Sequence, residues 1–522
     1  MNQTPAQSRL RHLGGAAAGL LAGLAGVAAA EAVAALVTGV TSPLFAVANR
    51  AVDAAPRPVK EWAIATFGTA DKPVLIGGVI ATVAALAVVA GVVGVRRPRV
   101  AAGFFLVLAA VSAVAAVTDR AATAPTGPRL LPVLALVGVG LPSLLGLLAL
   151  LRRDRLPAQV DGDELPATFD RRGFLRAALA VGAIAAAGGL VSQRFGGGAA
   201  AASRADVRIP APASRAPKLP AGAQLVVPGL SPYLTPNTEF YRVDTALKVP
   251  DVPIEGWTLR IHGMVDQELE LSYQDLLSRR LVERRITLTC VSNPVGGEYA
   301  GNATWIGVPV ADLLKEAGVR SGADAVRSTS ADDFTAGTPL PVLADPERGA
   351  LIALAMNGEP LPLAHGFPAR MVTPGLYGYV SATKWLVDLE VTRFADFAAY
   401  WTTRGYAEQA PIKTASRIDV PTPFARIGAG RTAVAGVAWS QDRGIDKVQV
   451  RVDSGRWHEA RLAVEDNVNT WRQWVWEWDA VPGNHLLEVR ATDRTGYTQT
   501  SQRAPIAPDG STGWHSTNVR VI

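Results

Sequence analysis

The sequence contains a single cysteine, Cys290, in the stretch Thr287-Leu-Thr-Cys-Val-Ser-Asn-Pro-Val-Gly-Gly297. A lone thiol has no disulfide partner within its chain. Most free cysteines are small buried apolar side chains, but a thiolate is also a good ligand for a soft metal. The residues before Cys290 alternate as in a strand, and those after it are turn residues. A side chain at the end of a strand, facing a loop-built cavity, is well placed to hold a cofactor. On these residues alone, both interpretations stay open.

Five apolar stretches are long enough, or nearly so, to cross a bilayer, which takes roughly 20 residues in a helix. They cover about residues 14–40, 73–95, 100–118, 130–151 and 174–191. We expect residues 1–158 to form a membrane domain of four transmembrane helices, so that the protein is a multi-pass protein of the cell membrane.

Basic clusters at the ends of these stretches predict their orientation. The clusters are Arg9 and Arg11, Arg96-Arg97-Pro-Arg99, and Arg152-Arg153-Asp-Arg155. Under the positive-inside rule these ends are cytoplasmic, which places the loops at 41–72 and 119–129 outside. The net charge of +6 is therefore largely a topology signal, and we expect no nucleic-acid partner.

The fifth stretch differs from the others. Asp170-Arg-Arg-Gly-Phe-Leu175 precedes an apolar run from Ala177 to Val191. Twin arginines before a mildly apolar run resemble a Tat export signal, here internal and left uncleaved as an anchor. The alternative is a plain stop-transfer helix with basic flanks. We expect residues 159–195 to form this twin-arginine-like segment and a fifth transmembrane helix. Either interpretation places the chain after about residue 195 outside the cytoplasm.

The exported part divides by composition. Residues 196–225 are rich in Ala, Gly and Pro and are typical of a linker. Residues 226–411 mix strands with short helices and predict an α+β domain. In it, Trp257–Gly263 has strand alternation, Ser272 is placed to cap a helical turn, and Val310–Gly318 is a short amphipathic helix closed by glycine.

Residues 412–522 contain short strands separated by turn residues. The clearest are Ala433–Trp439, Val448–Val452, Trp474–Trp478 and His485–Thr492. This spacing predicts an antiparallel β-sandwich of immunoglobulin-like type. The stripe of Trp474, Trp476 and Trp478 is most simply one packed face of a strand, although it could instead be a binding face.

An ordered set of local motifs resembles the sulfite oxidase family of molybdopterin-dependent oxidoreductases. The motifs are Thr235-Pro-Asn-Thr-Glu-Phe-Tyr-Arg242, Thr289-Cys290, Trp305-Ile-Gly307, Ala355-Met-Asn-Gly-Glu-Pro-Leu-Pro362, His365-Gly-Phe-Pro-Ala-Arg370, Thr373-Pro-Gly375 and Lys384-Trp385. The resemblance implies that residues 226–411 are a molybdopterin-binding catalytic domain. It also implies that residues 412–522 are a dimerisation domain, which predicts a homodimer.

The resemblance implies a role for each matching residue. Cys290 would be the protein thiolate on molybdenum. Further residues would bind the molybdopterin and its phosphate: Tyr241, Arg242, Asp332, His365, Arg370, Thr383 and Lys384. Arginine suits a phosphate because its planar fork donates charge-assisted hydrogen bonds. Tyr406 falls where the family has a tyrosine beside the metal, and Arg242 lies one residue before the position of one of the family's substrate-binding arginines. Tyr406 and Arg242 are therefore the predicted catalytic residues.

Two departures from the family bear on the substrate. Where typical sulfite oxidases have arginines that bind the sulfite dianion, this sequence has Val243 and Val295. A pocket without two cations should bind a dianion poorly. The sequence therefore argues against sulfite and favours two-electron oxygen-atom transfer at an S- or N-centre, with a neutral or organic S- or N-oxide as the substrate class.

The sequence also predicts a separate electron-transfer partner, a cytochrome or a quinone-linked protein. It has no C-x-x-C-H motif and no cysteine cluster, and its six histidines leave the spans without the pairs that bind haem. Two alternatives stay open: a sulfoxide or N-oxide reductase of the same family, and a cofactor-free cell-surface binding protein that keeps the fold. A transporter or sensor is a weaker third, since the spans hold few polar residues.

Overall fold

The computed structural model describes residues 5–37, 39–67, 71–120, 122, 124–152, 159–160, 163–164, 171–195 and 198–522. The predicted topology signals at Arg153 and Arg155, and Asp170 of the twin-arginine segment, lie outside the described residues. The chain forms two compact units: Met1–Ala201 with Ala246–Asp251, and Ala202–Thr245 with Val252–Ile522. The predicted domain boundaries after residues 158, 195, 225 and 411 stay predictions.

The first unit is helical. Its elements are α1 (Pro5–Leu36), α2 (Pro43–Ala54), α3 (Arg57–Phe67), α4 (Asp71–Arg96), α5 (Pro98–Thr118), α6 (Thr126–Arg129), α7 (Leu131–Arg152), the strand pair β1 (Gln159–Val160) and β2 (Asp163–Glu164), and α8 (Arg171–Phe195). Helix α9 (Ala199–Asp206) begins in this unit and ends in the second. Among the described residues, five helices are long and apolar enough to cross a membrane: Arg9–Leu36, Lys72–Arg96, Pro98–Thr118, Thr126–Arg152 and Arg172–Ser192. Each overlaps one of the five predicted stretches, although the first begins and ends about five residues earlier than predicted.

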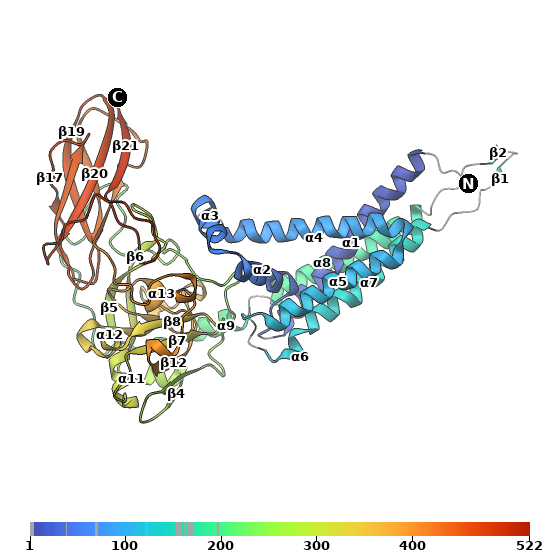
Figure 1. Cartoon of the computed structure of the whole chain (residues 1–522), viewed down its shortest axis with the longest axis horizontal. Helices are drawn as coiled ribbons and strands as arrows, with labels where there is room; N and C mark the ends of the chain where they lie inside the picture. The colour runs from blue at the N-terminus through green and yellow to red at the C-terminus, as the bar shows by residue number, and fades with distance from the viewer. Residues whose placement is uncertain are drawn as a thin grey trace. The chain divides into compact units, whose positions relative to one another are not determined.

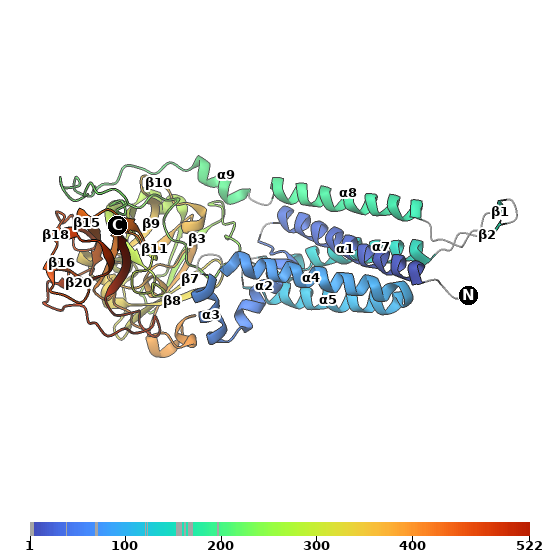
Figure 2. The same cartoon turned by 90° about the horizontal axis from the view of Figure 1, so that it is seen from above.

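Small residues let α1 approach its neighbours closely. Helix α1 packs against α4, α7 and α8, and the two views show it running alongside them (Figure 1, Figure 2). A Cβ atom added at Gly19 would lie 2.0 Å from the carbonyl oxygen of Ala87, and one at Gly91 would lie 2.0 Å from the carbonyl oxygen of Gly15. Such backbone contact is the usual basis of helix association in lipid, where apolar side chains gain little by leaving the solvent.

The α+β region of the second unit is built on two sheets. Its strands are β3 (Thr258–Gly263), β4 (Leu269–Ser272), β5 (Val282–Thr289), β6 (Ala300–Pro309), β7 (Ala325–Ser330), β8 (Thr335–Pro339), β9 (Leu351–Met356), β10 (Glu359–Pro360), β11 (Arg370–Val372) and β12 (Leu386–Thr392). One sheet has the order β10-β9-β6-β5 with β11 also paired to β9, and the other has the order β4-β3-β12-β7-β8. Every residue of β9 is buried, so the first sheet runs through the core.

Short helices close the connections between these strands. They are α10 (Tyr273–Ser278), α11 (Val310–Ala317), α12 (Leu340–Ala344) and α13 (Gly378–Ser381). Ser272 caps α10 in a reciprocal capping box with Asp275, which confirms the predicted cap. Helix α11 ends at Gly318, whose φ of 69° is left-handed, which confirms the predicted glycine stop.

The C-terminal β region (residues 412–522) contains two further sheets. Its strands are β13 (Ala415–Val420), β14 (Arg426–Ile427), β15 (Gly430–Trp439), β16 (Ile445–Val452), β17 (His458–Glu459), β18 (Arg461–Leu462), β19 (Arg472–Ala480), β20 (Gly483–Asp493) and β21 (His515–Val521). The sheet orders are β13-β15-β19-β18 and β14-β21-β20-β16-β17. Each of the four strands predicted here lies within an observed strand.

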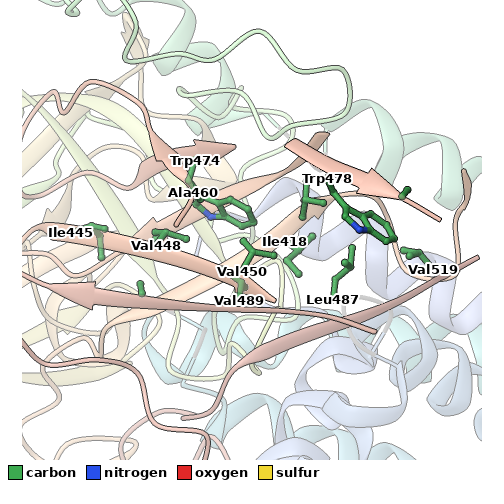
Figure 3. Close-up of a cluster of buried hydrophobic side chains, with 14 of the residues drawn as sticks. Ile418, Ile445, Val448, Val450, Ala460, Trp474, Trp478, Leu487, Val489 and Val519 are labelled. Atoms are coloured by element: carbon green, nitrogen blue, oxygen red, sulfur yellow. The ribbon is translucent and has the colours of Figure 1, made fainter. Parts of the chain in front are cut away.

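Both C-terminal sheets contribute to one hydrophobic core (Figure 3). Trp474 and Trp478 of one sheet are buried in it with Val450 and Leu487 of the other, and Trp476 packs against it while half-buried. The period of two therefore marks a packed face, as the sequence predicted. The finer assignment to an immunoglobulin-like sandwich stays a prediction.

The close approach of α1 and α4 gives a test. We expect Gly19→Val to lower the thermal stability of the detergent-solubilised protein, because the added side chain meets backbone that cannot rotate away; overpacking costs about 1–3 kcal/mol. Gly103→Val is the matched control, since nothing lies within 4 Å of a Cβ atom at that helical glycine. Equal unfolding temperatures for the two variants would contradict the packing described here.

Candidate active site

Cys290 follows directly on the last residue of β5 and faces a cavity. Its backbone N–H donates to the carbonyl oxygen of Tyr299 at 2.9 Å, which closes the base of the turn that follows. The backbone N–H of Ser292 donates to Sγ at 3.4 Å. The side chain is only 7% exposed, and burial raises the pKa of the thiol. A strand that ends in a turn at this cysteine is what the sequence predicted.

The cavity beside Cys290 has an empty volume of about 840 Å³, including the part open to solvent. Most of its wall is aromatic or apolar, with a small set of charged or ionisable groups. The lining residues include Phe240, Tyr241, Val243, Asp244, Cys290, Val291, Asp332, Phe334, Arg370, Tyr379, Lys384, Trp401 and Tyr406. Apolar walls with a few convergent polar groups are typical of cofactor and substrate sites.

Two cations are buried in this wall without enough negative charge around them. The guanidinium of Arg370 donates to the carbonyl oxygens of His365 and Ala382, and burial lowers its pKa to about 10. The Lys384 ammonium contacts Asp244 at 2.9 Å, yet burial outweighs this carboxylate and lowers the lysine pKa to about 8. A site that depresses the pKa values of its own cations is suited to an anionic ligand.

Three buried polar atoms around these cations lack a hydrogen-bond partner within the described residues. They are Nδ1 of His365, Nε of Arg370 and Oδ1 of Asp332. Buried polar groups are normally paired, so each marks a place for a ligand atom or a water molecule. Burial lowers the pKa of His365 to about 4 and raises that of Asp332, so the imidazole is neutral at physiological pH. The residues present therefore fit a hydrogen-bonding, phosphate-bearing group such as molybdopterin.

The other predicted binding residues surround this cluster at different depths. Tyr241 lines the cavity. Its pKa is raised mainly by burial and, to a smaller extent, by the nearby Cys290. Arg242 is not among the lining residues, but its guanidinium pairs at 2.9 Å with Asp244, which is. Thr383 is buried behind the wall, where its hydroxyl lies 2.7 Å from that of Ser328. The fold thus brings the predicted set together, with Arg242, His365 and Thr383 set back from the cavity surface.

Tyr406 lies on the cavity wall within an aromatic group. Its ring centroid is 5.7 Å from that of Tyr379 and 5.2 Å from that of Trp401. All three side chains line the same cavity as Cys290. The predicted catalytic tyrosine therefore shares the cavity with the predicted metal ligand.

Sequence reasoning missed several residues of this site. Asp244 is the carboxylate that pairs with both Arg242 and Lys384, and Trp401 forms part of the aromatic wall. The sequence offered one signal for Asp244, its place two residues after Arg242 in the same segment. It offered a similar signal for Trp401, which lies five residues before Tyr406 and accepts the backbone N–H of Tyr406 at 3.1 Å.

The two valines that the sequence singled out, Val243 and Val295, lie in different places. Val243 lines the Cys290 cavity and is 37% exposed. Val295 instead lines a second, more polar cavity of about 510 Å³, together with Asn293, Tyr377 and Ser416. Of the two, only Val243 lines the cavity that Cys290 faces.

Comparisons with known proteins point the same way. Residues 246–401 match the family described as oxidoreductase molybdopterin binding domain. The chain is 34% identical over 176 residues to the uncharacterized oxidoreductase YuiH of Bacillus subtilis (strain 168), which covers 33% of this chain and 84% of that protein. It is 30% identical over 345 residues to mitochondrial sulfite oxidase of Mus musculus, which covers 56% of this chain and 62% of that protein. The chain thus spans 62% of the length of this sulfite oxidase.

Among solved structures, the sulfane dehydrogenase SoxCD from Paracoccus pantotrophus is similar with a TM-score of 0.48 and 24% sequence identity. The similar part covers 54% of this chain and 80% of that chain.

The buried carboxyl of Asp332 makes the cofactor-free protein sensitive to pH. Because its pKa is raised on folding, the folded chain holds a proton that the unfolded chain releases above the ordinary value of 3.8. This contribution to stability is therefore lost as pH rises through the folded pKa. We expect Asp332→Asn to raise the free energy of unfolding at pH 7 by on the order of 1 kcal/mol, and to bring no gain near pH 3.

Denaturant unfolding of the cofactor-free protein across this pH range measures the effect. The neighbouring Asp333→Asn is the matched control, since Asp333 is exposed. A stability gain that does not depend on pH, or one shared by both variants, would contradict the assignment to the Asp332 carboxyl.

Proposed function

Because the chain belongs to the sulfite oxidase family of molybdopterin-dependent oxidoreductases, we propose that it catalyses two-electron oxygen-atom transfer at the S- or N-centre of a neutral small molecule. The observation that carries this proposal is the position of Cys290 on a cavity that Asp332 and Arg370 also line, each with an unpaired buried polar atom, while a third such atom belongs to His365, set back from the cavity surface. A soft thiolate and an anion-binding cluster on one cavity are what a molybdopterin site requires.

The apolar part of the cavity wall supports a neutral substrate, because the buried cations Arg370 and Lys384 are assigned to the cofactor. Arg242 and Lys384 both contact Asp244, and the exposed part of the wall is formed by side chains such as Val243, Phe334 and Trp401. A dianion entering here would lose its hydration without gaining charge-assisted hydrogen bonds from the apolar side chains. A neutral sulfur or nitrogen compound with an apolar substituent would lose little and would gain contact with the aromatic wall.

The proposal assigns a role to each predicted site residue. Cys290 would hold the metal, while Tyr241, Asp332, His365, Arg370, Thr383 and Lys384 would bind and orient the pterin and its phosphate. When bound, the molybdenum centre supplies oxygen-atom transfer coupled to two-electron redox chemistry. Tyr406 would orient the substrate through its hydroxyl and exchange a proton with it, while Arg242 would act on the site through its ion pair with Asp244.

The remaining features complete the proposal. The apolar helices would anchor the enzyme in the cell membrane, with the α+β region and the C-terminal β region outside the cytoplasm. The twin-arginine segment would serve for export as a Tat signal, and electrons would pass to or from a cytochrome or quinone-linked partner. Immunoglobulin-like C-terminal sheets would pair two copies as a homodimer.

A Cys290→Ser variant tests the function. The full chain, purified in detergent from a host that makes the cofactor, should oxidise or reduce one class among sulfite, organic sulfides, sulfoxides and N-oxides with artificial electron acceptors or donors. We expect Cys290→Ser to lower kcat by at least about 100-fold, because the metal loses its protein thiolate, while the unfolding temperature changes little. The direction that is active also separates the oxidase from the reductase. Unchanged turnover in the variant would contradict the proposal and favour a different use of the fold.

The two valines test the substrate class. We expect Val243→Arg to lower KM for sulfite by about tenfold or more, since a charge-assisted hydrogen bond contributes roughly 1.5–3 kcal/mol and each 1.4 kcal/mol is a factor of ten. Val295→Arg is the matched control and should leave KM for sulfite unchanged, because Val295 lines the other cavity. Steady-state kinetics measures KM for sulfite in both variants. A larger decrease in Val295→Arg than in Val243→Arg would contradict this assignment.

A further inference from the structure

We propose that the C-terminal β region positions the metal-ligating cysteine, and that Arg417, Ser511 and His515 act on the site by holding the loop Cys290–Gly297. The inference rests on the proposed function for the role of Cys290 and goes beyond it, because it makes residues 412–522 part of the active site. The contacts that carry it all lie within one compact unit, Ala202–Thr245 with Val252–Ile522.

The first contacts are on strand β5, which ends immediately before Cys290. Strand β5 is the edge of its sheet, so its outer backbone groups need partners from elsewhere. At Thr287 the C-terminal β region supplies them. The N–H of Thr287 donates to the carbonyl oxygen of Asn469 at 3.0 Å, and its carbonyl oxygen accepts from Nε2 of Gln441 at 2.7 Å. The strand that carries Cys290 is thus fixed three residues before the thiol.

An ion pair adds to this attachment further along the same strand. The guanidinium of Arg285 contacts both carboxylate oxygens of Asp466, at 2.6 and 2.7 Å. Both side chains are nearly buried, with exposed fractions of 9% and 2%. A bidentate pair of this kind fixes orientation as well as distance.

The second set of contacts is on the loop after Cys290. The hydroxyl of Ser511 donates to the carbonyl oxygen of Asn293 at 2.8 Å. The guanidinium of Arg417 donates to the carbonyl oxygen of Gly297 at 2.9 Å, while its other nitrogens bind Asp419 and Ser231. Arg417 is itself 8% exposed, so this donor is held in place by its own buried partners.

The third contact is a close fit between Gly296 and His515. A Cβ atom at Gly296 would lie 2.0 Å from Cδ2 of the His515 ring, and the φ of 78° already requires glycine. The ring is fixed in turn, because its Nδ1 accepts the backbone N–H of Ile418 at 2.9 Å. The turn of the cysteine loop therefore rests directly on β21.

The contacts between the cysteine loop and the C-terminal β region are separate points of attachment, and the second cavity lies beside them. The second cavity is bounded by the loop on one side and by the C-terminal β region on the other, with Asn293, Val295, Ser416, Gln499 and Ser511 among its lining residues. A loop held at separate points beside a cavity lacks the redundancy of a close-packed core. Since Ser292 in this loop donates to the Cys290 sulfur, a shift of the loop changes the surroundings of the thiol.

The test uses the fact that Cys290 is the only cysteine, so thiol labelling of the cofactor-free full chain reports on this residue alone. We expect Gly296→Ala to raise the labelling rate by roughly tenfold, because the thiol is only 7% exposed and a shift of the loop uncovers it further. Gly256→Ala is the matched control: its φ of 74° carries the same backbone strain, but nothing lies within 4 Å of the added Cβ atom. It should label at the wild-type rate.

Further variants separate positioning from general damage. His515→Ala makes room for the new methyl group, so the double variant Gly296→Ala/His515→Ala should label more slowly than the two single effects together predict. Ser511→Ala, a milder change, should raise the rate several-fold if Gly296→Ala does not fold. In the metal-loaded protein, the same variants should shift the molybdenum(V) electron paramagnetic resonance spectrum, which Gly256→Ala should leave unchanged.

Equal labelling rates for Ser511→Ala, Gly296→Ala and Gly256→Ala would overturn the inference. Because labelling needs no cofactor, this outcome is distinct from failure of the proposed function, which would appear as a chain that binds no molybdenum although its loop responds as expected.

Discussion

The site depends on the balance of charge in a wall from which water is largely excluded. Arg370 and Lys384 are both buried, and their lowered pKa values report that the carboxylate of Asp244 does not compensate them fully. The thiol of Cys290 and the carboxyl of Asp332 stand on the same cavity with raised pKa values. In all four groups, burial disfavours the charged form of the side chain. A ligand that brings phosphate to the cations and a metal ion to the thiol would relieve both imbalances together.

The thiol and the buried cations of this site come from different elements of the fold. The thiol comes from the end of β5, and Arg370 begins β11. Both strands belong to one sheet, in which β6 and β9 separate them. Lys384 lies in the turn after α13, and Asp332 follows β7, so the opposite wall belongs to the connections of the other sheet. Several of the ionisable groups therefore stand at or near the ends of strands, whereas Tyr241 and Asp244 come from the long segment between α9 and β3, in which Asp244 contacts Arg242 and Lys384.

Local sequence was enough to predict features whose cause is local. The strand and turn around Cys290, the capping box at Ser272 and the five apolar helices each follow from a few neighbouring residues. Features that arise from tertiary packing were out of reach. The ion pair of Asp244 with Lys384 joins residues 140 positions apart. Val295 lines the second cavity beside Gly296, whose close contact with His515 comes from more than 200 residues away in the chain. No alternation or spacing within a short window encodes such contacts.

The central claim is that Cys290 ligates a molybdenum–pterin cofactor in this cavity, and its most direct test is X-ray absorption at the molybdenum edge of the full chain, alongside metal and pterin analysis. The account predicts close to one molybdenum and one pterin per chain, with one sulfur neighbour fewer at the metal in Cys290→Ser. A folded protein that contains neither metal nor pterin, or a metal whose sulfur neighbours are unchanged by the substitution, would contradict it.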